Sequence, residues 1–117
     1  MFESDDISML RIYVSSTDKV ENRPIYESIV YKAKESGLSG ATVFRGVMGY
    51  GASSVIHSSK LWELTEKLPL IVELVDETAK IASFVESIGK LLDKMPKGCL
   101  VTMEKVKVMY HKSGKKA

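Results

Sequence analysis

The sequence has little of what disulfide-stabilised, membrane-spanning or strongly charged proteins require. Its single cysteine, Cys99, cannot form an internal disulfide. No apolar run reaches the roughly 18 residues that a spanning helix needs, and Glu73 interrupts the longest candidate. A net charge of +2 is too small to indicate a nucleic-acid or membrane partner, and only two histidines are available as metal ligands. These absences exclude disulfide scaffolds and membrane spans, and they argue against a metal site built from histidine.

What remains is the composition of an ordinary globular domain. The chain has 117 residues, of which 44% are hydrophobic and 27% charged, enough for one domain with a hydrophobic core. We expect a single domain over residues 1–117, with a core at about 8–110, a flexible loop at about 51–66 and a frayed tail at 111–117. The first residues are acidic where a secretory signal is basic, which predicts a cytoplasmic protein.

Hydrophobic periodicity predicts six main elements. Alternation predicts the first strand, β-branched residues the second, and an almost continuous apolar run the third. Apolar residues recur at helical spacing between Pro24 and Gly37, which predicts the first helix. A second set of apolar residues at this spacing lies between Asp76 and Pro96 and predicts the second helix. The expected strands are residues 8–15, 41–48, 70–75 and 99–110, and the expected helices are residues 25–36 and 77–95.

Three local features refine this prediction. Gly46 indicates a bulge or a close neighbour in the second strand. Asp76 is expected to cap the second helix, with Glu77 in its first turn. The alternation of the last strand changes parity at Glu104 or Lys105, which indicates a bulge or a change in the surface that the strand covers.

The order βαββαβ predicts an α+β fold, the ferredoxin-like split-βαβ sandwich. In this fold both helices cover one face of a four-stranded antiparallel sheet. The other face would carry Tyr13 among polar and apolar residues, and such a mixed face favours burial against further copies of the chain. We therefore expect a homo-oligomer.

A glycine-rich passage, residues 46–54, is the strongest local signal for a binding site. Glycines let backbone N–H groups approach an anion, and the serines that follow add hydroxyl donors, so phosphate is the natural guest. The spacing matches neither a P-loop nor a dinucleotide-binding fingerprint. An equally good alternative is that the glycines only accommodate strand bending before the loop.

Lysines strengthen the phosphate hypothesis. Lys60 closes the glycine-rich loop, Lys97 and Gly98 form a turn before the last strand, and Lys105 and Lys107 lie on that strand. Because the second and fourth strands lie at opposite edges of such a sheet, we expect the loop and these lysines to meet only between subunits. Three or four charge-assisted bonds of about 1.5–3 kcal/mol each suffice for micromolar binding.

Other reactive residues form no clear constellation. His57 is expected to be a solvated loop residue, and the two histidines lie in segments too mobile for a catalytic triad. Cys99 is expected to be a small core residue, with activation by neighbouring lysines as the alternative. Tyr50 and Trp62 either stack on a nucleobase or anchor the loop.

The motifs at residues 47–51 and 104–108 resemble those of the PII signal-transduction proteins. Residues 40–46, 57–60 and 68–72 are more closely similar to the PII-like bacterial and archaeal family of unknown function, domain of unknown function 190. The resemblance implies a trimer of ferredoxin-like subunits that binds an adenine nucleotide, ADP, AMP, ATP or cyclic AMP, in clefts between subunits. Lys107 falls where PII proteins have an arginine, and Met109 replaces a second arginine. The site residues that we predict are Gly49, Tyr50, Gly51, Ser53, Lys60, Lys97, Gly98 and Lys107.

The expected function is non-enzymatic regulation. Nucleotide binding would change the conformation of the long loop and so control a partner protein, such as a membrane transporter or channel. We predict no metal and no nucleic-acid partner. The alternatives are an RNA-binding module, which would need more sheet aromatics than Tyr13, and a small metal-handling or enzymatic trimer, which would need clustered ligands.

Overall fold

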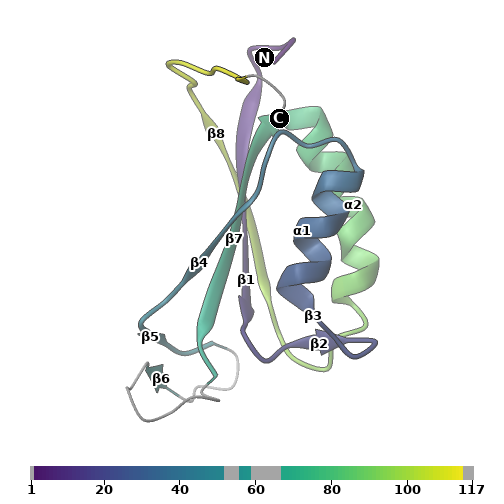
Figure 1. Ribbon diagram of the computed structural model, residues 1–117, viewed down its shortest axis with the longest axis vertical. Coiled ribbons are helices and arrows are strands. Elements are labelled where there is room, and N and C mark those ends of the chain that lie inside the picture. The colour runs from purple at the N-terminus through teal and green to yellow at the C-terminus, as the bar shows by residue number, and fades with distance from the viewer. Residues whose placement is uncertain (1, 52–55, 59–66, 115–117) are drawn as a thin grey trace.

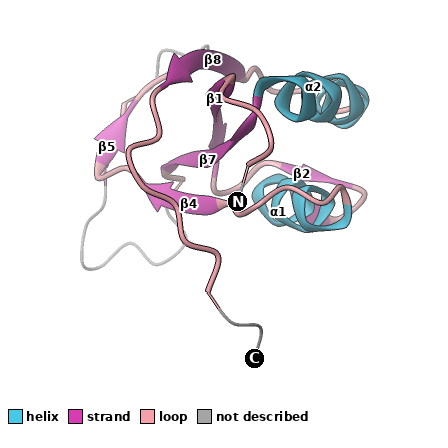
Figure 2. Cartoon of the chain, turned by 90° about the horizontal axis from the view of Figure 1, so that it is seen from above, coloured by secondary structure: helices cyan, strands magenta, loops and turns pink. Residues whose placement is uncertain are grey.

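The chain forms two layers, a four-stranded antiparallel sheet and two helices that both cover the same face of it (Figures 1 and 2). The computed structural model describes residues 2–51, 56–58 and 67–114. The sheet order β4-β7-β1-β8 is that of the expected ferredoxin-like α+β fold. In chain order the elements are β1 (Ile7–Ser15), β2 (Lys19–Val20), β3 (Arg23–Pro24), α1 (Ile25–Glu35), β4 (Thr42–Arg45), β5 (Met48–Gly49), β6 (His57–Ser58), β7 (Pro69–Glu77), α2 (Thr78–Leu92) and β8 (Leu100–Val106).

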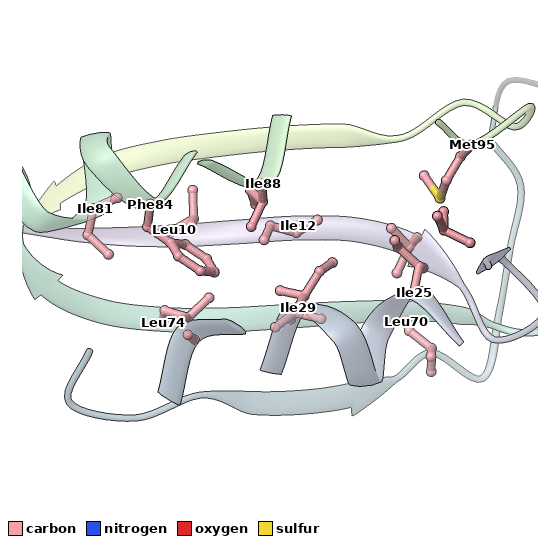
Figure 3. Packing of buried hydrophobic residues seen from close by; sticks show 14 residues of the cluster. Leu10, Ile12, Ile25, Ile29, Leu70, Leu74, Ile81, Phe84, Ile88 and Met95 are labelled. Carbon is pink, nitrogen blue, oxygen red and sulfur yellow. The ribbon is translucent and has the colours of Figure 1, made fainter. Parts of the chain in front are cut away.

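The hydrophobic core lies between the sheet and the helices (Figure 3). Alternate residues of β1 and β7 point toward the helices, as the period-two pattern predicts, and α1 and α2 meet them with residues at helical spacing. Full burial of one such aliphatic side chain stabilises the fold by about 1.5–3 kcal/mol. The fully enclosed members include Leu10, Ile12, Val72, Leu74, Ile25, Ile29, Ile81 and Ile88. No helix among the described residues has the length and apolar character needed to cross a membrane.

The start of α2 differs from the prediction. Glu77, not Asp76, is the residue before the helix, and no side chain caps its N–H groups. Asp76 is instead buried and accepts hydrogen bonds from the Ser39 amide at Oδ2 (2.8 Å) and from the Glu77 amide at Oδ1 (2.7 Å). Its carboxylate therefore ties the turn before β4 to the end of β7, a contact between distant segments.

The predicted second strand is divided into β4 and β5 at Gly46. The Gly46 amide donates to the Pro69 carbonyl (2.8 Å), but Pro69 has no N–H to return the bond, so the ladder with β7 stops. Beyond this point β5 pairs with β6 in a separate two-stranded sheet (Figure 1). A Cβ at Gly46 would lie 2.7 Å from Pro69 Cγ, which confirms the predicted close neighbour.

Of the two interpretations of the parity change in the last strand, the bulge is wrong, and the change in the surface that the strand covers agrees with the register. β8 pairs with β1 in an unbroken antiparallel register from Ile7 opposite Val106 to Tyr13 opposite Leu100. Because β8 is an edge strand with most of its residues exposed on both faces, its change of parity marks no break in the ladder. The tail beyond it begins with His111, whose ring stacks on Phe2 at 4.6 Å between ring centres.

The sheet face away from the helices is mixed, as expected. In the antiparallel register Phe44, Ile71, Tyr13 and Leu100 form one apolar row across all four strands. Farther along the face, Arg11 bonds the carboxylates of Glu73 (3.2 Å) and Glu104 (3.1 Å), so its charge is balanced on the sheet itself. Both helices lie on the other side of the sheet (Figure 2), and Phe44 and Leu100 at the two ends of this row are exposed.

Candidate functional site

A pocket of about 460 Å³ opens at the end of the sandwich where β1 ends and β7 begins. This volume lies within the range of small-molecule sites. The lining combines a mainly apolar wall with a few polar groups and comes from four separate segments of the chain. Its residues are Tyr13, Val14, Ser15, Asp18, Gly49, Tyr50, Gly51, Lys67, Leu68, Pro69, Leu70, Lys97, Gly98, Cys99 and Leu100.

The pairing of β1 with β7 fixes the floor of the pocket. Ser15 lies opposite Pro69, and two hydrogen bonds continue the contact beyond the strands. The Ser16 amide donates to the Leu68 carbonyl (2.9 Å), and the Leu68 amide donates to Ser16 Oγ (2.9 Å). These bonds hold the chain that returns from the long loop beside the end of β1, which places Lys67 at the pocket.

The glycines bring unobstructed backbone to the pocket. Neither Gly49 nor Gly51 has a positive φ, so a left-handed conformation does not explain their presence. A Cβ at Gly51 would have no atom within 4 Å, and one at Gly49 would meet only the Pro69 ring at 3.4 Å. The described residues therefore leave room for a side chain at Gly51.

Three charged side chains line the pocket, Lys67, Lys97 and Asp18. Lys97 is exposed, Lys67 is half-buried and Asp18 is buried. Neither lysine has an ion pair with another described residue. The described lining thus carries one more positive than negative side chain, which suits a guest of low negative charge.

Cys99 lines the same pocket but is not an activated thiol. Partial burial raises its pKa above the ordinary value, and the nearby carboxylates of Asp18 and Asp93 raise it further. The hypothesis that lysines lower this pKa is therefore wrong. The expected core position is also wrong, because Cys99 is exposed.

The pocket brings together five of the eight predicted site residues. Ser53 and Lys60 lie outside the described residues. Lys107 follows the end of β8 farthest from the pocket, because Leu100 lines the pocket and six further residues of extended strand, about 20 Å, lead to Val106. The residues that meet at the pocket are Gly49, Tyr50, Gly51, Lys97 and Gly98.

One structural expectation needs correction. We expected the glycine-rich loop to meet the lysines of the last strand only between subunits, yet residues 49–51 and Lys97 line one pocket within a single chain. The reason is that the chain after β4 and the turn before β8 lie at the same end of the sheet, although the two strands are on opposite edges (Figure 1). Lys105 does not line this pocket, since its Nζ lies 2.7 Å from Asp6 Oδ1 near the other end of the sheet, and its contact with the loop of another subunit stays a prediction.

Sequence reasoning missed three polar residues of the pocket, Ser15, Asp18 and Lys67. Ser15 ends the strand predicted over residues 8–15, and Asp18 and Lys67 lie three residues from a predicted strand, so the available signal was the antiparallel pairing of residues 8–15 with 70–75. Among the described residues, no group of three His, Cys, Asp or Glu side chains is placed to hold a metal ion.

Comparison with known proteins now identifies the family. Residues 7–108 match the model of the DUF190 family, described as "Uncharacterized ACR, COG1993". The chain belongs to the DUF190 family. A UPF0166 protein of Aquifex aeolicus (strain VF5) is 42% identical to it over 102 residues, which are 87% of this chain and 92% of the relative. A UPF0166 protein of Methanocaldococcus jannaschii is 36% identical over 87 residues, 74% of this chain and 73% of the relative.

Solved structures place the DUF190 chain in the PII-like fold. A "putative PII-like signaling protein" from Thermus thermophilus superposes with a TM-score of 0.63 at 13% identity, covering 87% of this chain and 88% of that one. CPII, a nitrogen regulatory PII-like protein from Thiomonas intermedia K12 bound to ADP, AMP and bicarbonate, gives 0.61 at 12% identity, with 87% and 89% covered. At these identities the likeness establishes the fold of the DUF190 chain and confirms the predicted PII-like resemblance.

Proposed function

We propose that this DUF190 chain is a non-enzymatic, PII-like regulator that binds an adenine nucleotide at the pocket and thereby controls a partner protein. The observation that carries the proposal is the meeting of the backbone of residues 49–51 with Lys67 and Lys97 around one cavity. Backbone amides and lysines are the donors that phosphate groups require. The ADP and AMP bound by CPII make adenine nucleotides the first ligands to test.

The charge of the pocket favours nucleotides with few phosphates. Two lysines stand against one buried carboxylate, Asp18, in the described lining. A triphosphate brings more negative charge than this lining neutralises, so ADP, AMP or cyclic AMP should bind more tightly than ATP unless further cations join the site. Ser53 and Lys60 remain proposed contributors from the loop, and Lys107 a proposed contributor from a neighbouring subunit.

The distribution of exposed apolar side chains supports assembly into a homotrimer. The described residues include eleven large hydrophobic side chains that are exposed, and ten of them lie in two segments, residues 44–56 and 100–110. These segments belong to the opposite edges of the sheet, β4 with β5 and β8 with the chain beyond it. Contact between one edge of a subunit and the other edge of the next is heterologous, and such contacts form a ring when the rotation from subunit to subunit closes. Three subunits is the number that the PII resemblance implies.

The short sheet of β5 and β6 connects the pocket to the long loop. Gly49 belongs to β5 and lines the pocket, while its pairing partner His57 lies on the returning side of the hairpin. A phosphate bound at Gly49 would favour one arrangement of this hairpin over others. A ligand shifts such an equilibrium only by its difference in affinity between the two states, and a changed loop at residues 51–66 would then engage or release the partner.

Isothermal titration calorimetry tests nucleotide binding. We expect heat with ADP, AMP or cyclic AMP at micromolar affinity, and about tenfold weaker binding for Lys97→Ala, which is about 1.4 kcal/mol. Gly51→Val should fold normally, because a Cβ at Gly51 has no atom within 4 Å, but bind weakly, because residue 51 lines the pocket and a side chain there hinders the approach of phosphate to the backbone. The control is Lys94→Ala, which removes the same charge from an exposed lysine that pairs with Glu21. No heat from the native chain with any adenine nucleotide overturns the proposal.

Light scattering at micromolar concentration tests the assembly. The native mass should be that of a trimer, and Leu100→Glu should reduce it by placing a charge in the apolar edge. The matched control is Tyr31→Glu, since Tyr31 is the one exposed large hydrophobic residue outside both edge segments among those described. A monomeric native chain, or equal dissociation by the two variants, contradicts the edge-to-edge assembly.

A further inference from the structure

One buried charge in the pocket has no part in phosphate binding. Asp18 is 5% exposed and lines the pocket beside residues 97–100. It is fixed in place, because Ser15 donates its amide to Asp18 Oδ2 (2.8 Å), Asp18 donates its own amide to the Ser15 carbonyl (3.1 Å), and Ile25 donates its amide to the Asp18 carbonyl (2.8 Å). The carboxylate is thus a rigid acceptor at the wall of the cavity.

The described residues leave acceptor positions of the Asp18 carboxylate unused, and neither of its oxygens is a fully enclosed atom without a partner. An ionised carboxylate offers about four acceptor positions on its two oxygens, and the Ser15 amide occupies one of them. No described lysine, arginine or histidine lies within 4 Å of it, although Lys67 and Lys97 line the same pocket. A guest that displaces water from this carboxylate incurs a cost unless it supplies hydrogen-bond donors. The cavity is the direction from which further donors can come.

The sign of the charge limits what those donors are. A carboxylate repels phosphoryl oxygens, so the phosphates of a guest are held by Lys67, Lys97 and the glycine backbone rather than by Asp18. Its neighbourhood suits the neutral, donor-bearing half of a nucleotide. Two groups of an adenine nucleotide share this chemistry, the exocyclic amino group of the base and the ribose hydroxyls.

We infer that Asp18 is a specificity residue that accepts a hydrogen bond from the nucleoside half of the ligand, from either the base amino group or a ribose hydroxyl. This inference rests on the proposed nucleotide binding and extends it to discrimination. A site that holds a buried acceptor rejects analogues that lack the matching donor, because the acceptor is then left unpaired. Asp18 also disfavours free phosphate and pyrophosphate, which bring negative charge without a nucleoside.

The test compares the native chain with Asp18→Asn, which keeps a side-chain oxygen for the Ser15 amide but removes the charge. Calorimetry with AMP, IMP and 2′-deoxy-AMP separates the two donors, since IMP lacks the amino group and 2′-deoxy-AMP lacks a ribose hydroxyl. We expect the native chain to prefer AMP over at least one analogue by about tenfold or more. Asp18→Asn should reduce that preference to within about threefold and raise the affinity for pyrophosphate several-fold.

A smaller preference for AMP together with a higher affinity for pyrophosphate distinguishes recognition from a structural role, because a misfolded pocket binds every ligand more weakly. Asp18→Ser is a second neutral variant whose hydroxyl can accept from the Ser15 amide, and Glu21→Gln is the control for loss of one exposed negative charge nearby. If the native chain binds AMP but Asp18→Asn and Asp18→Ser keep its preferences, the role of Asp18 is refuted and nucleotide binding stands. If the native chain binds no nucleotide, both proposals fail.

Discussion

Replacing Gly46 with alanine should destabilise the fold by about 1 kcal/mol, because the new methyl group has no room. Its Cβ would lie 2.7 Å from Pro69 Cγ and 3.4 Å from the Pro69 carbonyl oxygen. Pro69 cannot easily retreat, because its carbonyl accepts the Gly46 amide and the residue pairs with Ser15 in the sheet. Overpacking of this kind costs about 1–3 kcal/mol, and the lower entropy of the unfolded alanine chain offsets about 0.4–1 kcal/mol of it.

Thermal and urea unfolding of the native chain and of Gly46→Ala measure this loss of stability. A destabilisation of about 1 kcal/mol corresponds to a fall of roughly 3–6 °C in Tm for a chain of this size. The matched control is Gly40→Ala, where a Cβ has no atom within 4 Å and φ is not positive, so no loss is expected. If Gly46→Ala is as stable as Gly40→Ala, the close approach of Gly46 to Pro69 at the pocket floor is refuted.

Three further predictions concern ionisable groups. Cys99 should react slowly with iodoacetamide at pH 7–8, because partial burial and the charge of Asp18 raise the pKa of its thiol. Asp18→Asn should shift the pH profile of Cys99 alkylation to lower pH, and an unchanged profile contradicts the influence of Asp18 on this thiol. Lys105 and the Thr78 hydroxyl lower the pKa of Asp6, so the stabilisation is present above about pH 4 and is lost as pH falls through the folded pKa. The difference in Tm between Asp6→Asn and the native chain should therefore be largest at pH 7 and should shrink as pH falls below about 4, and an equal difference across this range would be inconsistent with the pairing. Asp76→Ala should cost about 2–4 kcal/mol in urea unfolding, because two backbone amides lose a buried acceptor, and a loss below about 1 kcal/mol contradicts that role.

The sequence is sufficient to predict the parts of the fold that depend on local periodicity. Alternation in residues 8–15 and the apolar run at 70–75 predicted the two central strands, because both are long and each has one face fully buried. The close neighbour of Gly46 was also predicted, since a glycine inside a strand indicates a tight approach.

Errors arose where distant segments decide the outcome. Asp76 has the sequence position of a helix cap, but its carboxylate bonds the Ser39 amide, which lies 37 residues earlier in the chain. The bulge expected near Glu104 relied on alternation, which carries no information in an edge strand exposed on both faces. Both cases depend on the tertiary arrangement rather than on local sequence.

The candidate site was predictable only in part, for the same reason. Residues 49–51 and Lys97 were found because glycines and a turn lysine are recognisable motifs for anion binding. Asp18 and Lys67 carry no such motif, and they reach the pocket only through the register of β1 with β7. Residues of a pocket that is lined by strand ends can be predicted only after the pairing of those strands is known.

The most direct measurement is a crystal structure of the protein grown with ADP. The account predicts ADP in the pocket, with phosphoryl oxygens within hydrogen-bond distance of the amides of residues 49–51 and of Lys97 Nζ, and its nucleoside half toward Asp18. ADP bound elsewhere, or a pocket that stays empty at saturating ADP, would contradict it.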